Sequence, residues 1–600
     1  MRKLLSGNEA LALGTYHAGG SVAVAYPGTP STEILETLAE FSDIYAEWST
    51  NEKVAMEVAM GASYAGVRAI VSMKHVGLNV ASDPFMAAST TGVNAGLVIV
   101  CADDPGMHSS QNEQDTRHYG KLAKVPVLEP TDSQEAYDLM AYAFDISERF
   151  DTPVLVRSTT RISHSKSVVM TEQKRPGPKG KPSFPYNKAK YVMLPVSARA
   201  RHPLVEERLV KLANYAETSP LNQVIWERQN LGVVTSGIAY QYAREVFPEA
   251  SFLKLGMTYP LPRNLIRDFA ARVARLIVIE ELDPFLQETI QSMGIQAAGK
   301  EFIPRVGELN VNIIEESSRQ AGWITSAPRR QVAHKIPDLP GRPPLLCPGC
   351  PHTGIFFVLS SIGQRAKPKS TSPPEPKLVI TGDIGCYTLG AYPPLNALDT
   401  TACMGASIGQ AHGMEKAGIG TKVIAVIGDS TFIHSGITSL VNAVYNSSQI
   451  TIIILDNGTT AMTGQQDHPG TGITAQGEET SALALENLAR GIGVKDVRIL
   501  DAFDLTALRT GVRSALDNPE ISVIIVRGTC SVHVPRRANP RVIDAEKCDR
   551  CEVCLLIGCP AIQKDNGRIY TDTELCVGDY CTICQQLCPH KAITRSKGAK

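Results

Sequence analysis

The segment VIAVIGDSTFIHSGITSLVNAVYNSSQITIIILDNG, residues 423–458, contains two apolar runs that each end in a polar turn. The run Val423–Ile427 is followed by Gly-Asp-Ser, and the run Ile450–Leu455 is followed by Asp-Asn-Gly. Continuous apolar runs joined by helical stretches are typical of parallel strands that are buried on both faces. We therefore expect an α/β domain in which both turns lie at one edge of the sheet, where ligands of such folds bind.

Similar apolar runs occur through most of the chain, at Ser21–Tyr26, Leu97–Cys101, Pro153–Val156, Leu276–Ile279 and Ser522–Val526. A chain of 600 residues is too long for one core, so the pattern predicts several doubly wound parallel-sheet α/β domains. The segments Ser163–Tyr191, Ser326–Leu346 and Lys367–Lys377 are rich in Pro, Lys, Ser or Arg and are expected to be linkers or exposed loops. Domain limits are therefore expected near residues 195, 335 and 538.

Charge and hydropathy argue against two classes of partner. The chain has 59 basic and 60 acidic side chains, which gives no electrostatic reason to expect binding to nucleic acid or to an anionic membrane. No apolar run approaches the roughly 20 residues of a membrane span, and Met1–Ala10 has no signal-peptide pattern. The 14 cysteines therefore indicate metal ligands rather than disulfides, and a cytoplasmic location is expected because a reducing compartment keeps cysteines free to bind metal.

Eight cysteines lie in the last 53 residues, in two runs that each close with Cys-Pro: Cys548, Cys551, Cys554 and Cys559, then Cys576, Cys581, Cys584 and Cys588. The pattern resembles a bacterial-type ferredoxin with two [4Fe–4S] clusters, in which the cysteine before proline ligates the other cluster. A Cys₄ zinc site has no need of such runs, and disulfides suit secreted chains. The resemblance implies one cluster on Cys548, Cys551, Cys554 and Cys588, and another on Cys576, Cys581, Cys584 and Cys559. The four-residue gaps before Cys559 and Cys581 depart from the common spacing.

The turns of residues 423–458 resemble the thiamine-diphosphate motif, in which GDG and NN stand a similar distance apart. Here 25 residues separate Ser430 from Asp456, with Ser430 in place of a glycine and Asp456 in place of an asparagine. Asp429 and Asn457 offer the hard oxygen ligands that Mg²⁺ prefers, and Gly428 lets a phosphate approach the backbone. The resemblance adds the Thr459 carbonyl as a third ligand. The other interpretation is that both segments are ordinary strand-end turns.

Three residues elsewhere fit the same cofactor by resemblance. Glu52 begins a helical stretch and resembles the glutamate that hydrogen-bonds the pyrimidine ring in thiamine enzymes. Met404 precedes a Gly/Ala-rich helical stretch, where thiamine enzymes place a bulky apolar residue that bends the cofactor. Tyr26–Thr32, YPGTPST, resembles the YPITPS segment of 2-oxoacid:ferredoxin oxidoreductases, which assigns substrate contact to Thr29. A solvent-facing helix glutamate and a core methionine remain alternatives for Glu52 and Met404.

A third cluster is implied by the same family. Its cofactor-binding subunits carry a CPGC pair, a GIGC segment and a late cysteine, which match Cys347, Cys350, Cys386 and Cys530. These four residues are expected to hold a further [4Fe–4S] cluster near the thiamine. A tight turn with buried cysteines, or a structural zinc, would also explain them. His352 follows the CPGC pair and is expected to contact cofactor or substrate.

Taken in order along all 600 residues, these motifs resemble the large (alpha) subunits of indolepyruvate:ferredoxin oxidoreductases. The resemblance implies a thiamine pyrimidine-binding domain (1–195), a transketolase-C-like domain (196–335), a thiamine diphosphate and Mg²⁺ domain (336–537) and a ferredoxin domain (538–600). It implies oxidative decarboxylation of an aryl pyruvate such as indole-3-pyruvate, with coenzyme A as acyl acceptor and ferredoxin as electron acceptor. It also implies a smaller beta subunit and a dimer of heterodimers.

The loop Asp103–His108 supports an aryl substrate, because pyruvate enzymes carry a carboxylate-binding arginine there and this chain has none before Arg117. Other 2-oxoacids (branched-chain, phenylglyoxylate or pyruvate) remain alternatives. A non-redox thiamine decarboxylase would have no use for the ferredoxin cysteines. A polyferredoxin carrier would leave the thiamine residues unexplained.

Overall fold

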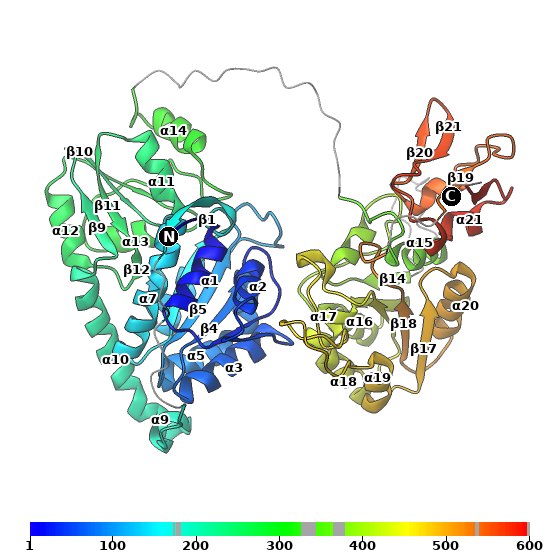
Figure 1. The fold of residues 1–600 in the computed structure, drawn as a ribbon, viewed down its shortest axis with the longest axis horizontal. Helices are drawn as coiled ribbons and strands as arrows, with labels where there is room; N and C mark the ends of the chain where they lie inside the picture. Colours follow the sequence, from blue (N-terminus) through cyan, green and yellow to red (C-terminus); the bar gives the residue numbers. More distant parts are fainter. Residues whose placement is uncertain (172–174, 176–181, 326–343, 364–377, 535–538, 597–600) are drawn as a thin grey trace. The chain divides into compact units, whose positions relative to one another are not determined.

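The computed structural model describes residues 1–171, 175, 182–325, 344–363, 378–534 and 539–596 (Figure 1). The chain forms two compact units, one of residues 1–335 with Ala475–Gly477 and the other of residues 336–474 and 478–600. Each unit is described by itself. The segment Lys367–Lys377 lies outside the described residues, and so do residues 326–343 of the segment Ser326–Leu346.

The first unit is built on a seven-stranded sheet of order β12-β6-β7-β5-β4-β2-β3. In that order the strands are β12 (Met257–Tyr259), β6 (Val127–Leu128), β7 (Val154–Thr159), β5 (Leu97–Asp103), β4 (Ala69–Lys74), β2 (Val22–Ala25) and β3 (Tyr45–Trp48). All pairs are parallel except β12 with β6. Along β5, Val98 and Val100 face one core while Leu97, Ile99 and Cys101 face the other, so the sheet is buried on both faces.

Helices cover both faces of this sheet. One face packs against α1 (Gly7–His17), α2 (Thr32–Ala39) and α7 (Ser133–Phe150). The other packs against α3 (Glu52–Tyr64), α4 (His75–Val80), α5 (Ser82–Thr91) and α6 (Arg117–Ala123). Small elements complete this part: α8 (Thr160–His164), α9 (Lys188–Tyr191) and the antiparallel ribbon of β1 (Arg2–Ser6) and β8 (Lys166–Met170).

The long helix α10 (Pro195–Thr218) leads to a second sheet in the same unit, of order β13-β10-β11-β9. Its strands are β13 (Leu276–Ile279), β10 (Arg228–Thr235), β11 (Ala250–Leu255) and β9 (Asn222–Ile225). One face packs against α11 (Gly237–Val246) and α14 (Val311–Gln320), and the other against α12 (Arg263–Ala271) and α13 (Phe285–Gln291).

The second unit contains a five-stranded, fully parallel sheet of order β14-β15-β16-β18-β17. Its strands are β14 (Leu378–Thr381), β15 (Lys422–Gly428), β16 (Thr451–Asp456), β18 (Ser522–Arg527) and β17 (Asp496–Asp501). The helices α15 (His352–Ile362) and α20 (Leu505–Leu516) pack on one face. The helices α16 (Ala406–Lys416), α18 (Ile437–Tyr445) and α19 (Leu485–Ile492) pack on the other.

The cysteine-rich end is built from small elements with little regular structure. Two antiparallel strand pairs, β19 (Arg541–Ile543) with β22 (Ile593–Arg595) and β20 (Ile562–Asp565) with β21 (Arg568–Thr571), frame the short helix α21 (Ile583–Leu587). Ile557, Ile583 and Ile593 share a core with α15 and α20, so this end packs on that face of the second unit.

The fold class predicted from the sequence is confirmed. All seven apolar runs are strands in sheets that are mostly parallel, from β2 at Val22–Ala25 to β18 at Ser522–Arg527. The three domain limits stay predictions, and those near 335 and 538 fall outside the described residues. In the part of the chain that the structure describes, no helix combines the length and apolar character that crossing a bilayer requires.

Candidate active site

The two polar turns meet at the carboxyl edge of the second unit's sheet. Gly428 at the end of β15 is paired in register with Leu455 of β16. The Asp429 carboxylate then joins the turns: its Oδ1 accepts the Ser430 N–H at 2.7 Å, and its Oδ2 accepts the N–H groups of Asn457 at 3.2 Å and Gly458 at 2.9 Å. Because Asp429 bonds to both segments, the motif halves that lie 25 residues apart in the sequence form one site.

The remaining predicted ligands lie around Asp429. Asn457 and Thr459 are buried, and the Asn457 side-chain oxygen accepts the Thr459 N–H at 3.2 Å. The Ser430 hydroxyl bonds to Thr460 at 3.1 Å. The Asp456 carboxylate instead accepts from Arg527 of the neighbouring strand at 2.7 Å, and burial raises its pKa.

Two buried histidines flank Asp429. His352, the first residue of α15, stands edge-on to the Tyr387 ring, and burial lowers its pKa to about 4 against the attraction of the Asp429 charge. His468 was not anticipated from the sequence. Its buried Nε2 lies 3.4 Å from Asp429 Oδ2 and makes no hydrogen bond to any described residue. A phosphate oxygen would satisfy that nitrogen, so the polar groups present fit a diphosphate held with a hard cation.

Met404 lies half-buried in the turn that begins α16, and a second unanticipated residue holds this turn. The Asp383 carboxylate accepts the N–H groups of Gly405 at 2.8 Å and Ser407 at 3.1 Å. Gly405 has φ +85° and sits against Ser435, where a Cβ would come within 2.3 Å of its side chain. The turn around Met404 is therefore fixed by the polar partner beneath it and by a position that only glycine fits.

Glu52 and Thr29 belong to the first unit. Glu52 is the first residue of α3, follows the N-cap Asn51 and is 5% exposed. Its carboxylate lies against Gly77 of α4, where a Cβ would come within 2.6 Å of Oε1. Thr29 follows β2, and its carbonyl accepts from the Ser109 hydroxyl at 3.1 Å. Glu52 is therefore a buried carboxylate rather than a solvent-facing one.

The four cysteines of the proposed third cluster gather in the second unit. Burial raises the pKa of the Cys350 thiol, and the sulfurs of Cys347, Cys386 and Cys530 raise it further. Burial likewise raises the pKa of Cys386 to about 11, with Cys347 and Cys530 adding to the effect. These thiols come from three segments far apart in the chain, so their proximity is a property of the fold.

The eight ferredoxin-type cysteines gather as two crossed groups. Burial raises the pKa of Cys554 to about 11, and the sulfurs of Cys548, Cys551 and Cys588 raise it further. Burial raises the pKa of Cys584, and Cys581, Cys559 and Cys576 add to that rise. Backbone N–H groups also donate to sulfur, from Arg541 and Gly578 to Cys576 at 3.4 Å and from Ala592 to Cys588 at 3.2 Å.

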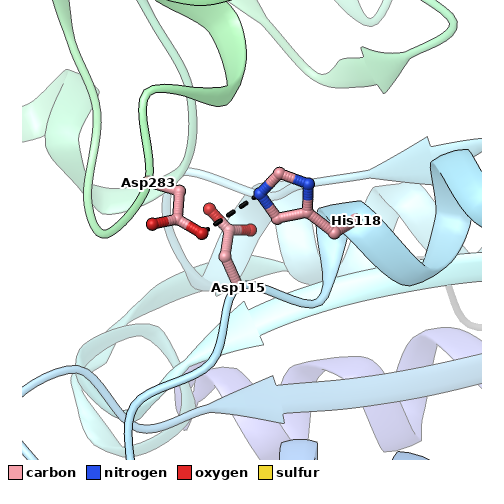
Figure 2. A group of neighbouring side chains, drawn as sticks. All are labelled: Asp115, His118 and Asp283. Carbon is pink, nitrogen blue, oxygen red and sulfur yellow. Dashed lines mark hydrogen bonds and ion pairs between the residues drawn. The ribbon is translucent and has the colours of Figure 1, made fainter.

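One further group has the spacing of a metal site. Asp115, His118 and Asp283 have ligand atoms within 4.8 Å of one another, and Figure 2 shows the His118 ring turned toward Asp283. Asp115 already accepts two bonds from Arg117, at 2.8 and 2.5 Å, and Arg117 holds its pKa well below the usual range despite burial. Its charge is therefore neutralised within the protein, which makes it a poor metal ligand.

Comparison with known proteins places the chain. The family model described as "Pyruvate flavodoxin/ferredoxin oxidoreductase, thiamine diP-bdg" matches residues 13–223, and "Thiamine pyrophosphate enzyme, C-terminal TPP binding domain" matches residues 383–526. Indolepyruvate oxidoreductase subunit IorA of Archaeoglobus fulgidus is 40% identical over 99% of this chain and 97% of that protein. The chain belongs to the family of the indolepyruvate oxidoreductase subunits IorA. The subunits IorA of Methanothermobacter marburgensis, 41% identical over 99% of this chain and 97% of that protein, and of Pyrococcus horikoshii, 39% identical over 99% and 96%, agree.

Membership of the IorA family makes the chain part of an enzyme of the 2-oxoacid:ferredoxin oxidoreductase type, with thiamine diphosphate as cofactor. The family predicted from the sequence is thereby confirmed. The chain also resembles a solved 2-oxoglutarate:ferredoxin oxidoreductase from Magnetococcus marinus, with 15% identity and a TM-score of 0.43. The match spans 53% of this chain and 65% of the solved chain. That likeness is too weak to carry an argument.

Proposed function

We propose that this chain catalyses the oxidative decarboxylation of aryl pyruvates, with indole-3-pyruvate as the reference substrate. One 2-oxoacid, one coenzyme A and two oxidised ferredoxins give one arylacetyl-CoA, one CO₂, two reduced ferredoxins and one proton. The observation that carries the proposal is full-length similarity to proteins named indolepyruvate oxidoreductase subunits. The loop Asp103–His108, which carries no arginine, supports an aryl pyruvate over pyruvate.

Two sets of residues are assigned to thiamine diphosphate, and each is described within its own unit. Asp429, Asn457 and the Thr459 carbonyl would hold Mg²⁺ and the diphosphate, beside Gly428, Ser430 and the buried histidines. Met404 would support the cofactor, and the buried Glu52 carboxylate would hydrogen-bond its pyrimidine ring. When bound, thiamine diphosphate supplies the nucleophile and electron sink for cleaving the bond to the substrate carboxylate.

The three cysteine groups are assigned to three [4Fe–4S] clusters. Tetrahedral zinc with bonds of about 2.3 Å would bring its sulfurs to about 3.8 Å from one another. Among the described residues, no three cysteine sulfurs lie within 4.8 Å of one another. This wider spacing favours clusters over zinc.

The clusters would form a path for single electrons. The Gly349 N–H donates to the Cys559 sulfur, and Gly349 sits against Val577. The third cysteine group, which includes Cys350, therefore borders the ferredoxin-type group that includes Cys559. The Tyr580 hydroxyl donates across the same boundary to the Thr529 carbonyl at 2.7 Å. Electrons would therefore pass from the group of Cys350 to the group of Cys559, then to the group of Cys554 and on to ferredoxin.

The proposal includes partners beyond this chain. The relatives are named subunits, which supports a partner subunit. The proposal takes this partner to be a smaller beta subunit, the assembly to be a dimer of heterodimers, and the location to be the cytoplasm. The test is reduction of a viologen dye by the two-subunit complex with indole-3-pyruvate and coenzyme A. Turnover with pyruvate or branched-chain oxoacids but none with aryl pyruvates would refute the substrate assignment.

A further inference from the structure

Lys74 lies at the carboxyl edge of the first unit's sheet, beside the residues assigned to thiamine and substrate. It is the last residue of β4 and precedes α4, whose Gly77 contacts Glu52. A Cβ on Gly28 would come within 3.4 Å of the Lys74 Cγ and Cδ. The aliphatic part of the lysine therefore runs along the turn that carries Thr29.

The Lys74 side chain is half-buried, and its ammonium has few partners within the protein. Its Nζ donates to the Ser109 carbonyl at 3.0 Å, and the Ser109 hydroxyl donates to the Thr29 carbonyl at 3.1 Å. Among the described residues, no carboxylate oxygen forms an ion pair with it within 4.0 Å. Burial lowers its pKa to about 8, against the attraction of Asp104 and Glu52. An ammonium has three N–H donors, so this one retains donors for an incoming anion.

Asp104 is not the ion-pair partner of Lys74. Its carboxylate accepts from the Ser109 N–H at 2.8 Å, the Ser110 hydroxyl at 2.7 Å and the Thr160 hydroxyl at 2.7 Å. Against the burial that raises it, these neutral donors and, to a smaller extent, the Lys74 charge hold the pKa of Asp104 below the ordinary value. Hydrogen bonds from neutral donors thus stabilise this carboxylate more than the lysine charge does.

Arg117, the next arginine after the loop, does not supply the cation either. It is fully buried and donates to Asp115 at 2.8 Å and to Glu280 at 2.7 Å. Freeing it would leave two carboxylates uncompensated in the core.

We propose that the Lys74 ammonium binds the carboxylate of the 2-oxoacid substrate, taking the place of the arginine that the loop lacks. This inference rests on the proposed function. The lysine sets the requirement for an anionic group next to the reacting carbonyl, and Thr29 lies on the adjoining turn.

The test compares Lys74→Met, Lys74→Arg and wild-type two-subunit complexes on two substrates. Indole-3-pyruvate has the carboxylate, whereas indole-3-acetaldehyde lacks it and gives the same acyl-CoA and the same two electrons, with release of a proton in place of CO₂. Loss of a charged hydrogen bond predicts a kcat/KM lower by about 10- to 150-fold for the oxoacid in Lys74→Met. Aldehyde oxidation and bound thiamine should stay unchanged, and Lys74→Arg should recover part of the loss.

Lys53→Met is the matched control, because Lys53 is a half-exposed lysine on α3 paired with Glu57, next to Glu52. It should leave both substrates unaffected. Calorimetric binding of indole-3-lactate, an unreactive carboxylate, gives a readout independent of turnover: wild type should bind it and Lys74→Met should not. That result would support carboxylate binding by Lys74 even if no 2-oxoacid were turned over. A lack of turnover would refute the proposed function and leave the role of Lys74 standing. Parallel losses on both substrates, or unchanged oxoacid kinetics, would overturn the inference.

Discussion

Gly77→Ala tests whether the position of the Glu52 carboxylate governs activity. The new methyl group would stand 2.6 Å from Oε1, 2.8 Å from Cγ and 3.0 Å from Cδ of Glu52, all closer than the ordinary contact of 3.4 Å. Relief of the closest contact requires a shift of the carboxylate of about 0.8 Å. A misplacement near 1 Å at a reacting centre costs up to about 100-fold in rate, so we expect kcat to fall by about 10- to 100-fold.

The free energy of unfolding of Gly77→Ala should change little or increase, although kcat falls. Alanine in a helix is favoured over glycine by about 0.5–1 kcal/mol, which offsets the local contact. Gly61→Ala is the matched control, because Gly61 is in α3 itself and a Cβ there meets nothing within 4 Å. It should gain a similar helix preference and keep full activity.

The assay follows the exchange of the C2 proton of bound thiamine with D₂O, by acid quench and NMR, beside viologen reduction. Both should slow in Gly77→Ala and neither in Gly61→Ala, with the same iron and thiamine contents. Wild-type exchange and turnover in Gly77→Ala would refute the role given to the Glu52 carboxylate.

Three further predictions follow from the site. Glu52→Gln should keep its iron yet lose reduction of the clusters by substrate; retained activity would contradict the role of Glu52. Cys530→Ser should lose about four iron atoms, counted by colorimetry, while the ferredoxin-type clusters stay; an unchanged iron count would argue against a third cluster. Because only the protonated Lys74 attracts a carboxylate and its pKa is lowered to about 8, kcat/KM for the oxoacid should fall above about pH 8 in wild type. Asp104 and Glu52 are the charges that face the lysine. Lys74→Arg should abolish the fall in kcat/KM at high pH, and a fall that persists in that variant would show that another group titrates.

Local sequence was enough to predict the strands and the edge around Asp429. Continuous apolar runs specify doubly buried strands, and polar turns at the ends of neighbouring parallel strands must meet. The same reasoning placed Asn457 beside Asp429, 25 residues after Ser430 in the sequence. Crossed grouping of the ferredoxin-type cysteines was also predicted, from the resemblance of both Cys-Pro runs to two-cluster ferredoxins.

The residues that sequence reasoning missed owe their position to tertiary contacts. His468 lies in a glycine-containing loop beyond Asn457, and nothing in its neighbourhood predicts that it returns to Asp429. Asp383 ends up close to Met404 although 20 residues separate them, and no sequence pattern predicts that its carboxylate fixes the turn of Met404. Lys74 ends an apolar strand and would pass for a surface lysine, whereas the fold half-buries it against Gly28.

The proposed reaction sends electrons from an aryl pyruvate through thiamine into the cysteine-bound clusters of this chain. The most direct measurement is low-temperature EPR of the anaerobic two-subunit complex, frozen after mixing with indole-3-pyruvate and coenzyme A. Signals of reduced [4Fe–4S] clusters are expected in the wild type and not in Glu52→Gln, although dithionite should produce them in both proteins. Clusters that dithionite reduces but indole-3-pyruvate leaves oxidised in the wild type would contradict the proposed reaction.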